Sequence, residues 1–144
     1  QNHSEAFAIG RYPEDQYDGI QSTEGNPWYI TTAAVGEYYY LLAKAWEWRG
    51  SIEVTPLNLP FLNSLEVPEL DSEQSYASSH RTFQKILSRM RAKGEAYLSL
   101  IHKYVPNDGG LTEQFNRKTG APQGAVHLTW SYAALLALMQ ARDL

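Results

Sequence analysis

Cysteine is absent from the 144 residues of the chain, so neither a disulfide framework nor a thiolate metal site can form. The four histidines, His3, His80, His102 and His127, show no metal-ligand spacing, and we expect no bound metal and no cofactor. Long apolar runs are lacking too, because the longest, YAALLALM at 132–139, falls well below the roughly 20 residues that cross a bilayer. We therefore expect no membrane partner.

Positive charge is also in short supply. The net charge is -4 and the sequence pI is about 5.5, and basic residues gather only in SHRTFQKILSRMRAK at 79–93. This balance gives no electrostatic footprint for a phosphate backbone, so we expect no nucleic-acid partner. What the chain does have is 43% hydrophobic and 12% aromatic residues, enough to bury the core of one domain or of part of a larger one.

The first predicted helix begins at NPW, where Asn26 can cap it and Pro27 occupies its first position, and it ends at Gly50. Its apolar side chains recur at three- and four-residue steps, which predicts one buried stripe. The stripe comprises Trp28, Ile30, Ala34, Tyr38, Leu41, Leu42, Ala45 and Trp48.

Further helices follow along the chain. SIEVT at 51–55 reads as an extended link, and NLPFLNSL at 58–65 as a brief helix capped by its asparagine. A second long helix is predicted over 79–104, with Gly94 inside it where a neighbour approaches closely. Basic residues occupy its polar face, and its apolar face comprises Phe83, Ile86, Leu87, Met90, Tyr97, Leu98, Ile101 and Val105. Thr129 can cap a last helix that is apolar almost all round and is expected to be buried. The predicted class is all-α with helical hairpins and no sheet, and the unpaired apolar faces suggest further chain.

Unusual residues gather in four stretches at helix starts or in the loops before them: GRYPED (10–15), GNPWY (25–29), GGLTEQF (109–115) and LTWSYA (128–133). If the helices alternate in direction, these stretches meet at one end. They would bring together carboxylates, an arginine and aromatic rings, which are the groups that bind sugars. The polar candidates are Arg11, Glu14, Asp15 and Glu113, and the aromatic ones are Tyr12, Trp28, Phe115 and Trp130.

Each candidate also has a purely structural explanation. Trp28 and Trp130 can be core or helix-start packing residues, and Arg11 can simply pair with a neighbouring carboxylate. Glu113 can be a turn carboxylate satisfied by backbone amides. The residue pattern by itself leaves these alternatives open.

The motifs GRYPED with GNPWY, KYVPNDGGLTEQFNRKTG and HLTWSYAALL resemble, in order and over nearly the whole chain, the C-terminal third of fungal glucoamylases of glycoside hydrolase family 15. The resemblance implies an (α/α)6 toroid of inner and outer helices, of which residues 1–144 form the C-terminal part of a single catalytic domain, incomplete by itself and without a starch-binding domain. It implies starch and malto-oligosaccharides as substrates, and the N-terminal remainder of the same domain as the partner of this part.

The family removes glucose from non-reducing ends of α-1,4 chains and, more slowly, from α-1,6 branches, with inversion to β-glucose. Inversion needs a general acid and a general base. The resemblance places Glu113 at the position of the base. The acid belongs to a WEE-like motif that does not occur in these residues, since WEW at 46–48 lies inside a helix. We therefore expect the general acid to come from a missing N-terminal part, without which the chain is inactive.

The same resemblance assigns sugar contacts to Arg11, Tyr12, Glu14 and Trp28, and supporting positions to Gln114 and Trp130. Gly124 stands where several relatives carry a serine whose hydroxyl can bond the base. We expect this glycine to move the acidic limb of the pH profile upward, and expect Gly124→Ser to restore it.

A secreted glycoprotein is expected, with Asn2 in NHS as the glycosylation candidate. Two alternatives remain beside the main hypothesis. One is a catalytically silent helical module that binds carbohydrate or protein, and the other is a related toroid glycosidase of different linkage specificity.

Overall fold

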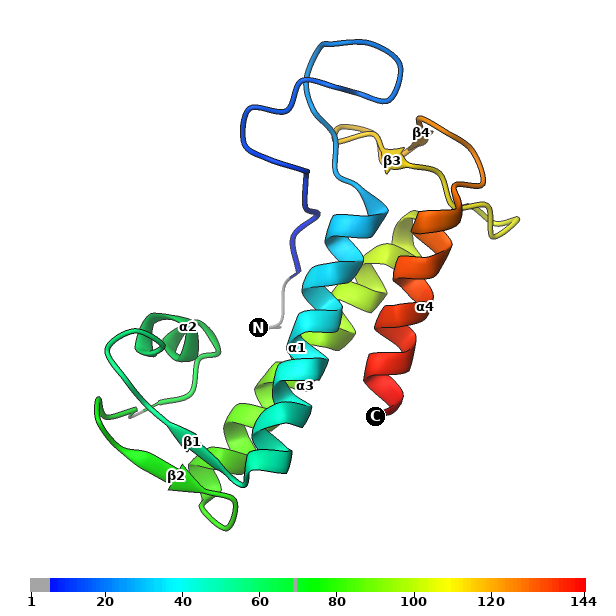
Figure 1. The fold of residues 1–144 in the computed structure, drawn as a ribbon. Coiled ribbons are helices and arrows are strands. Elements are labelled where there is room, and N and C mark those ends of the chain that lie inside the picture. Colours follow the sequence, from blue (N-terminus) through cyan, green and yellow to red (C-terminus); the bar gives the residue numbers. More distant parts are fainter. Residues whose placement is uncertain (1–5, 69) are drawn as a thin grey trace.

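The computed structural model describes residues 6–68 and 70–144, so Asn2 lies outside the described residues. Long helices α1, α3 and α4 lie side by side, with a small lobe of α2, β1 and β2 at one end and the β3–β4 ribbon at the other (Figure 1). The elements are α1 (Tyr29–Arg49), β1 (Ser51–Glu53), α2 (Leu59–Ser64), β2 (Ser75–Ala77), α3 (Arg81–Tyr104), β3 (Gln114–Phe115), β4 (Pro122–Gln123) and α4 (Thr129–Asp143).

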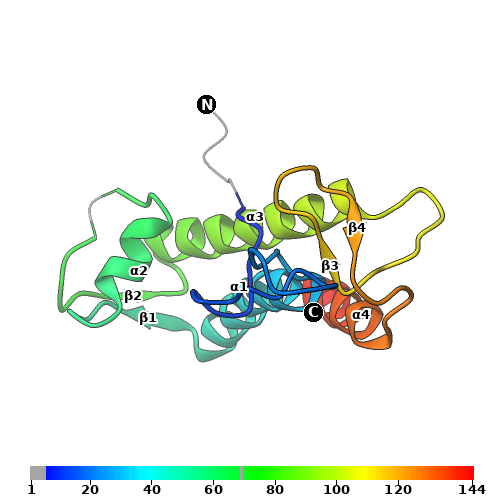
Figure 2. The ribbon, with the colours of Figure 1, turned by 90° about the horizontal axis from the view of Figure 1, so that it is seen from above.

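The helix directions bring distant loops together. Helix α1 runs away from the end that carries the β3–β4 ribbon, α3 returns to it, and α4 leaves it again (Figure 1). The N-terminal loop and the ribbon lie over this end when the molecule is seen from above (Figure 2). The starts of α1 and α4 therefore share one end, as the alternation of helices predicted.

The all-α prediction is confirmed for the main body, while the expectation of no sheet is wrong. Strand β1 pairs with β2 and β3 pairs with β4, each as an antiparallel two-stranded ribbon. Each ribbon has two or three residues per strand, too few for a periodic pattern to reveal them. Among the described residues no helix is long and apolar enough to cross a membrane.

The buried face of α1 differs from the predicted stripe. The side chains of this helix that are buried are those of Tyr29, Thr32, Ala33, Gly36, Tyr40 and Ala43. Tyr38, Leu41 and Trp48 are instead 51%, 43% and 91% exposed. Small residues on the inward face let the helices approach closely. Helix α1 carries apolar side chains on all of its faces, so the periodicity of the sequence could not identify the buried face.

The predicted helix caps are also partly wrong. Helix α1 starts at Tyr29 with Trp28 at its N-cap, and α4 starts at Thr129 with Leu128 at its N-cap. Asn26 donates instead to the carbonyl oxygen of Asp18 and accepts from the amide of Arg117, at 3.0 Å each. Asparagine at this position thus joins loops rather than capping a helix.

Helix α4 is not fully buried. Only Ser131, Leu138 and Ala141 are buried along it, whereas Leu136 and Met139 are 58% and 45% exposed. By contrast, most of the predicted face of α3 is confirmed. Phe83, Ile86, Leu87, Met90, Tyr97 and Ile101 are buried, while Leu98 and Val105 are partly buried.

Gly94 lies where a neighbour does approach closely, as predicted. A Cβ at this position would lie 2.5 Å from Cε2 of the Tyr40 ring on α1. Alanine favours an exposed helix interior by about 1 kcal/mol over glycine, but overpacking costs about 1–3 kcal/mol. The clash is therefore the larger effect.

We expect Gly94→Ala to lower the free energy of unfolding by up to about 2 kcal/mol, the overpacking cost less the helix-propensity gain. Denaturant unfolding of the full-length polypeptide measures it. In a Tyr40→Ala background the same substitution should be neutral or stabilising, because the ring is gone. An equal loss in both backgrounds would place the cause elsewhere.

Candidate active site at the starts of α1 and α4

The Glu113 loop is bound to the start of α1 through its backbone. Trp28 and Gln114 form an antiparallel bridge, and the amide of Phe115 donates to the carbonyl oxygen of Pro27 at 3.2 Å. The amide of Tyr29 donates to the carbonyl oxygen of Glu113 at 3.5 Å. These contacts position the loop independently of its side chains.

The first turn of α4 holds the same loop from its other side. The amide of Leu128 donates to the carbonyl oxygen of Leu111 at 3.1 Å, and the buried hydroxyl of Ser131 donates to the carbonyl oxygen of Thr112 at 2.8 Å. The amide of Glu113 itself donates to the carbonyl oxygen of Ala125 at 2.9 Å. Backbone on both sides of Glu113 is therefore fixed.

The carboxylate of Glu113 remains partly exposed at this end. Its Oε2 accepts from Nε2 of the buried Gln114 at 3.3 Å. Gly124 lies against it, because a Cβ on Gly124 would lie 2.7 Å from Oε2 and 3.0 Å from Cβ of Glu113. A partly exposed carboxylate on a fixed backbone can accept a proton from a water molecule.

Arg11 links the N-terminal loop to this carboxylate electrostatically. Its guanidinium donates two bonds of 2.8 Å to the carboxylate of Asp15, whose side chain is only 4% exposed. These hydrogen bonds to Asp15 raise the pKa of Arg11, and the negative charge of Glu113 adds to that rise. The hydrogen bond from Arg11 also holds the pKa of Asp15 below its usual value.

Aromatic rings surround the guanidinium of Arg11. Its Cζ lies 4.5 Å from the ring centroid of Trp28 and 5.4 Å from those of Tyr12 and Tyr17. Trp28 in turn packs at 5.9 Å against Trp130. These are distances at which cation–π and aromatic contacts are favourable.

The aromatic candidates differ in accessibility. Trp28 is 2% exposed and lies against Arg11 and Trp130, so its ring is covered in this structure. Its indole Nε1 has no hydrogen-bond partner among the described residues. Tyr12 and Trp130 are 56% and 46% exposed. Glu14 is exposed, and its side chain makes no hydrogen bond or ion pair within the described part of the chain. The four stretches thus meet, with Trp28 as the support under the exposed residues.

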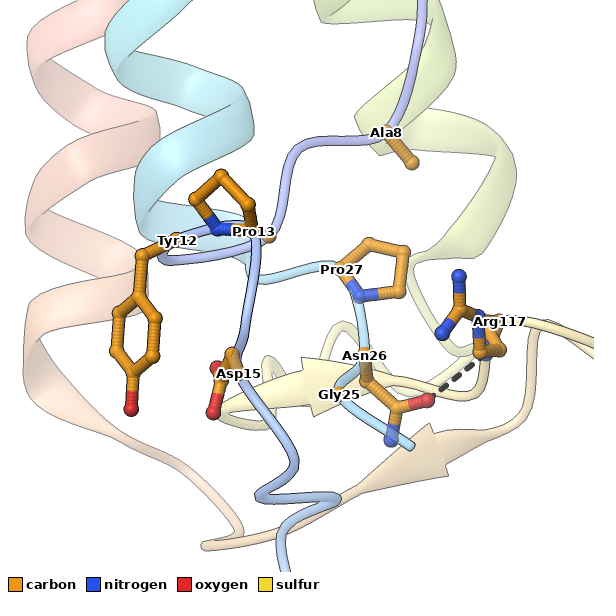
Figure 3. A pocket seen from close by; sticks show the side chains of 9 residues that line it. Ala8, Tyr12, Pro13, Asp15, Gly25, Asn26, Pro27 and Arg117 are labelled. Atoms are coloured by element: carbon orange, nitrogen blue, oxygen red, sulfur yellow. Dashed lines mark hydrogen bonds between the residues drawn. The ribbon is translucent and has the colours of Figure 1, made fainter. Parts of the chain in front are cut away.

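A polar pocket of about 340 Å³ lies beside this cluster (Figure 3). Tyr12 lines one side and Arg117 the other, and Asn26 joins the two loops by its bond to the amide of Arg117. Glu113 does not line this pocket. In residues 6–68 and 70–144 no group of three or more histidine or carboxylate side chains is placed to hold a metal ion.

Sequence reasoning overlooked the residues that fasten the loop. Ser131 and Tyr132 were part of the LTWSYA stretch, but only Trp130 was selected from it. The hydroxyl of Tyr132 accepts from the amide of Leu111 at 3.0 Å. Hydroxyl side chains in the first turn of a helix that follows a glycine-rich loop were the available signal.

The fold and the site define a helical segment in which a partly exposed carboxylate lies near an arginine and aromatic rings. The family model for glycosyl hydrolases family 15 matches residues 1–140. The chain therefore belongs to glycosyl hydrolase family 15.

Named relatives agree with this assignment. A glucoamylase of Blastobotrys adeninivorans is 39% identical over 94% of this chain and 22% of its own length. A glucoamylase of Neurospora crassa is 41% identical over 91% of this chain and 20% of its own length. The chain thus spans about a fifth of the length of these curated relatives.

Solved structures show the same fold. A family 15 glucoamylase from Hypocrea jecorina superposes with a TM-score of 0.88 at 42% identity, over 98% of this chain and 22% of its own. A glucoamylase from Saccharomycopsis fibuligera gives 0.88 at 33% identity, over 99% and 31% of the two chains. The likeness confirms the expectation of a segment of the helical glucoamylase fold.

The geometry at Gly124 changes the expectation for serine at this position. Gly124 has φ +79°, in the left-handed region that disfavours any side chain, and a Cβ would lie within 3.0 Å of two Glu113 atoms. Gly124→Ser is therefore no simple restoration of a hydroxyl, because this backbone and the carboxylate would both have to move.

Because the family resemblance implies that Glu113 is the general base, we expect Gly124→Ala to lower kcat of the full-length polypeptide by about ten- to a hundredfold, the cost of misplacing a reacting group by up to 1 Å. Steady-state kinetics on maltotriose measure it. Gly50→Ala is the matched control, since Gly50 has φ +75° with no atom within 4 Å of its Cβ position. It should cost stability but not kcat. Equal kcat losses would mean that backbone strain alone is responsible.

Asp15 makes the stability of the folded protein depend on pH in the acidic range. Because its folded pKa lies below 3.8, its stabilising contribution is complete above that value and is lost as the pH falls through the lowered folded pKa. We expect Asp15→Asn to destabilise the protein near neutral pH and the difference from the parent to shrink below about pH 4. Thermal unfolding from about pH 2 to 7 measures it. A deficit of Asp15→Asn that stayed constant over this pH range would contradict the linkage.

Proposed function

We propose that the chain forms the general-base side of the active site of an inverting exo-glucosidase. The substrates are starch and malto-oligosaccharides, from whose non-reducing ends the enzyme removes α-1,4-linked and, more slowly, α-1,6-linked glucose as β-glucose. Glu113 is the base that activates water. Because starch is a polymer, the same proposal makes the enzyme extracellular and recoverable from the culture medium.

One observation carries this proposal: Glu113 is the partly exposed carboxylate on a loop whose backbone is bonded both to α1 and to α4. A general base must be ionised, reachable by water and held in place. Arg11 lies close enough for its charge and that of Glu113 to interact. Exposed Tyr12 and Trp130 offer flat apolar faces for a sugar ring.

The general acid is proposed to come from outside residues 1–144. An inverting pair needs a second carboxyl group roughly 6.5–9.5 Å from the base. Asp15 does not suit this work, because it is committed to Arg11 and its pKa is lowered, whereas an acid needs a raised pKa. The relatives are about five times as long as this chain, and their remaining length is the natural source of the acid.

The same remainder is proposed to cover the groove between α3 and α4. This groove, of about 440 Å³, is walled by Leu98, Ile101, Val105, Leu135 and Met139, and Glu95 and His102 also line it. Apolar side chains of this kind are stabilised by burial, and a helix of the remainder would supply it. We therefore expect residues 1–144 by themselves to release no glucose.

Glu113→Gln in the full-length polypeptide tests the assignment of the base. Glutamine keeps the shape but cannot accept the proton, so we expect kcat to fall by about 10²- to 10⁴-fold with little change in maltose binding. Proton NMR of maltotriose digests measures the rate and shows which anomer appears before mutarotation. Glu24→Gln, which removes an exposed carboxylate paired with Lys118, should stay within about twofold of the parent.

Initial β-glucose from the parent and its loss in Glu113→Gln would support the proposal. Initial α-glucose would exclude inversion, whatever Glu113 does. Full activity of Glu113→Gln would exclude Glu113 as the base. A full-length parent that binds maltose but never releases glucose would identify a silent binding protein.

A further inference from the structure

The hydroxyl of Tyr132 is joined to two groups outside its own helix. It accepts from the amide of Leu111 at 3.0 Å, and it lies 2.8 Å from Nδ1 of His127. Leu111 stands two residues before Glu113 and is 1% exposed. The contact therefore fixes a buried amide in the loop that carries the proposed base.

The proton positions follow from counting. A tyrosine hydroxyl has one proton to donate, and here its oxygen must accept from Leu111 because an amide can only donate. Its own proton is then free to go to Nδ1 of His127. We assign Nδ1 of His127 as the acceptor, which places the imidazole proton on Nε2. Histidine thereby orients the hydroxyl toward the loop.

The backbone of His127 supports this role. It has φ +51°, a conformation that histidine adopts only at a cost. The imidazole lies nearly parallel to the Tyr132 ring, with an interplanar angle of 6° and centroids 6.4 Å apart. A strained residue that places its ring nitrogen on one hydroxyl points to a function for that contact.

We propose that Tyr132 is a positioning residue for Glu113, and that His127 is the acceptor that orients its hydroxyl. The proposal rests on the proposed function, because it takes Glu113 as the base. Without the hydroxyl the buried Leu111 amide loses its partner, and the loop must shift to find another. The hydroxyl of Ser131 still donates to the carbonyl oxygen of Thr112, and the amide of Leu128 still donates to the carbonyl oxygen of Leu111. The chain therefore remains folded while the carboxylate of Glu113 moves.

The test uses Tyr132→Phe, His127→Gly and His127→Asn in the full-length polypeptide. Glycine removes the imidazole acceptor but tolerates the left-handed backbone, whereas asparagine tolerates that backbone and offers a side-chain oxygen. Tyr38→Phe is the matched control, since Tyr38 is 51% exposed and its ring packs only on other aromatic rings among the contacts that we observe in the described residues. Measurements are kcat and KM on maltotriose and hydrogen exchange of the segment that contains Leu111.

We expect Tyr132→Phe to lower kcat about tenfold with KM within about twofold, because the base is misplaced while substrate binding is kept. Hydrogen exchange of the Leu111 segment should become faster in the same variant. His127→Gly should also lower kcat, and the kcat of His127→Asn should be closer to that of the parent. Tyr38→Phe should change neither quantity.

A kcat of Tyr132→Phe within twofold of the parent would overturn the proposal, as would unchanged exchange at Leu111. Equal losses in His127→Gly and His127→Asn would overturn the role of the acceptor. Failure of the proposed function is distinguishable, because it would appear as full activity of Glu113→Gln. An inactive Glu113→Gln with a normal Tyr132→Phe would reject this inference alone.

Discussion

The pairing of backbone between the start of α1 and the Glu113 loop is the contact on which the rest of the site depends. Trp28 bridges to Gln114, and Phe115 donates to Pro27, across more than eighty residues of chain. The amide of Trp28 also donates to the carbonyl oxygen of Ile9, which brings in the N-terminal loop. Arg11 and Glu113 are close enough for their charges to interact because both of their loops are bonded to this same short stretch.

Packing extends this pairing into the core. Phe115 lies between Tyr29 and Tyr104, with ring centroids 5.0 and 4.5 Å away. The hydroxyl of Tyr29 donates to the carbonyl oxygen of Tyr104 at 2.6 Å, and burial raises its pKa to about 12, so it remains a donor at any ordinary pH. The end of α3 is thereby tied to the starts of α1 and α4, and the loop rests on three helices.

Sequence reasoning succeeded where one signal dominated and failed where several competed. The apolar face of α3 was correct because its opposite face is charged. The prediction of the buried face of α1 was wrong because this helix carries apolar residues on all of its faces. Packing against the neighbouring elements decides that Tyr40 is buried while Trp48 is exposed. The meeting of the four stretches followed from helix direction alone. The bonds of Ser131 and Tyr132 did not, because they depend on side-chain distances that no spacing encodes.

The loop around Glu113 and the outer face of α4 differ in whether this chain alone supplies their contacts. At the site end, backbone amides and carbonyls around Glu113 find partners within this chain, so the geometry of the loop is intrinsic to the segment. Along α4, Leu136 and Met139 stay exposed, and their burial requires other chain. If Glu113 is the base, as proposed, its orientation is settled within this segment before a general acid is supplied from elsewhere. Under the same proposal, only the distance between the two carboxyl groups remains to be set, and this distance distinguishes inversion from retention.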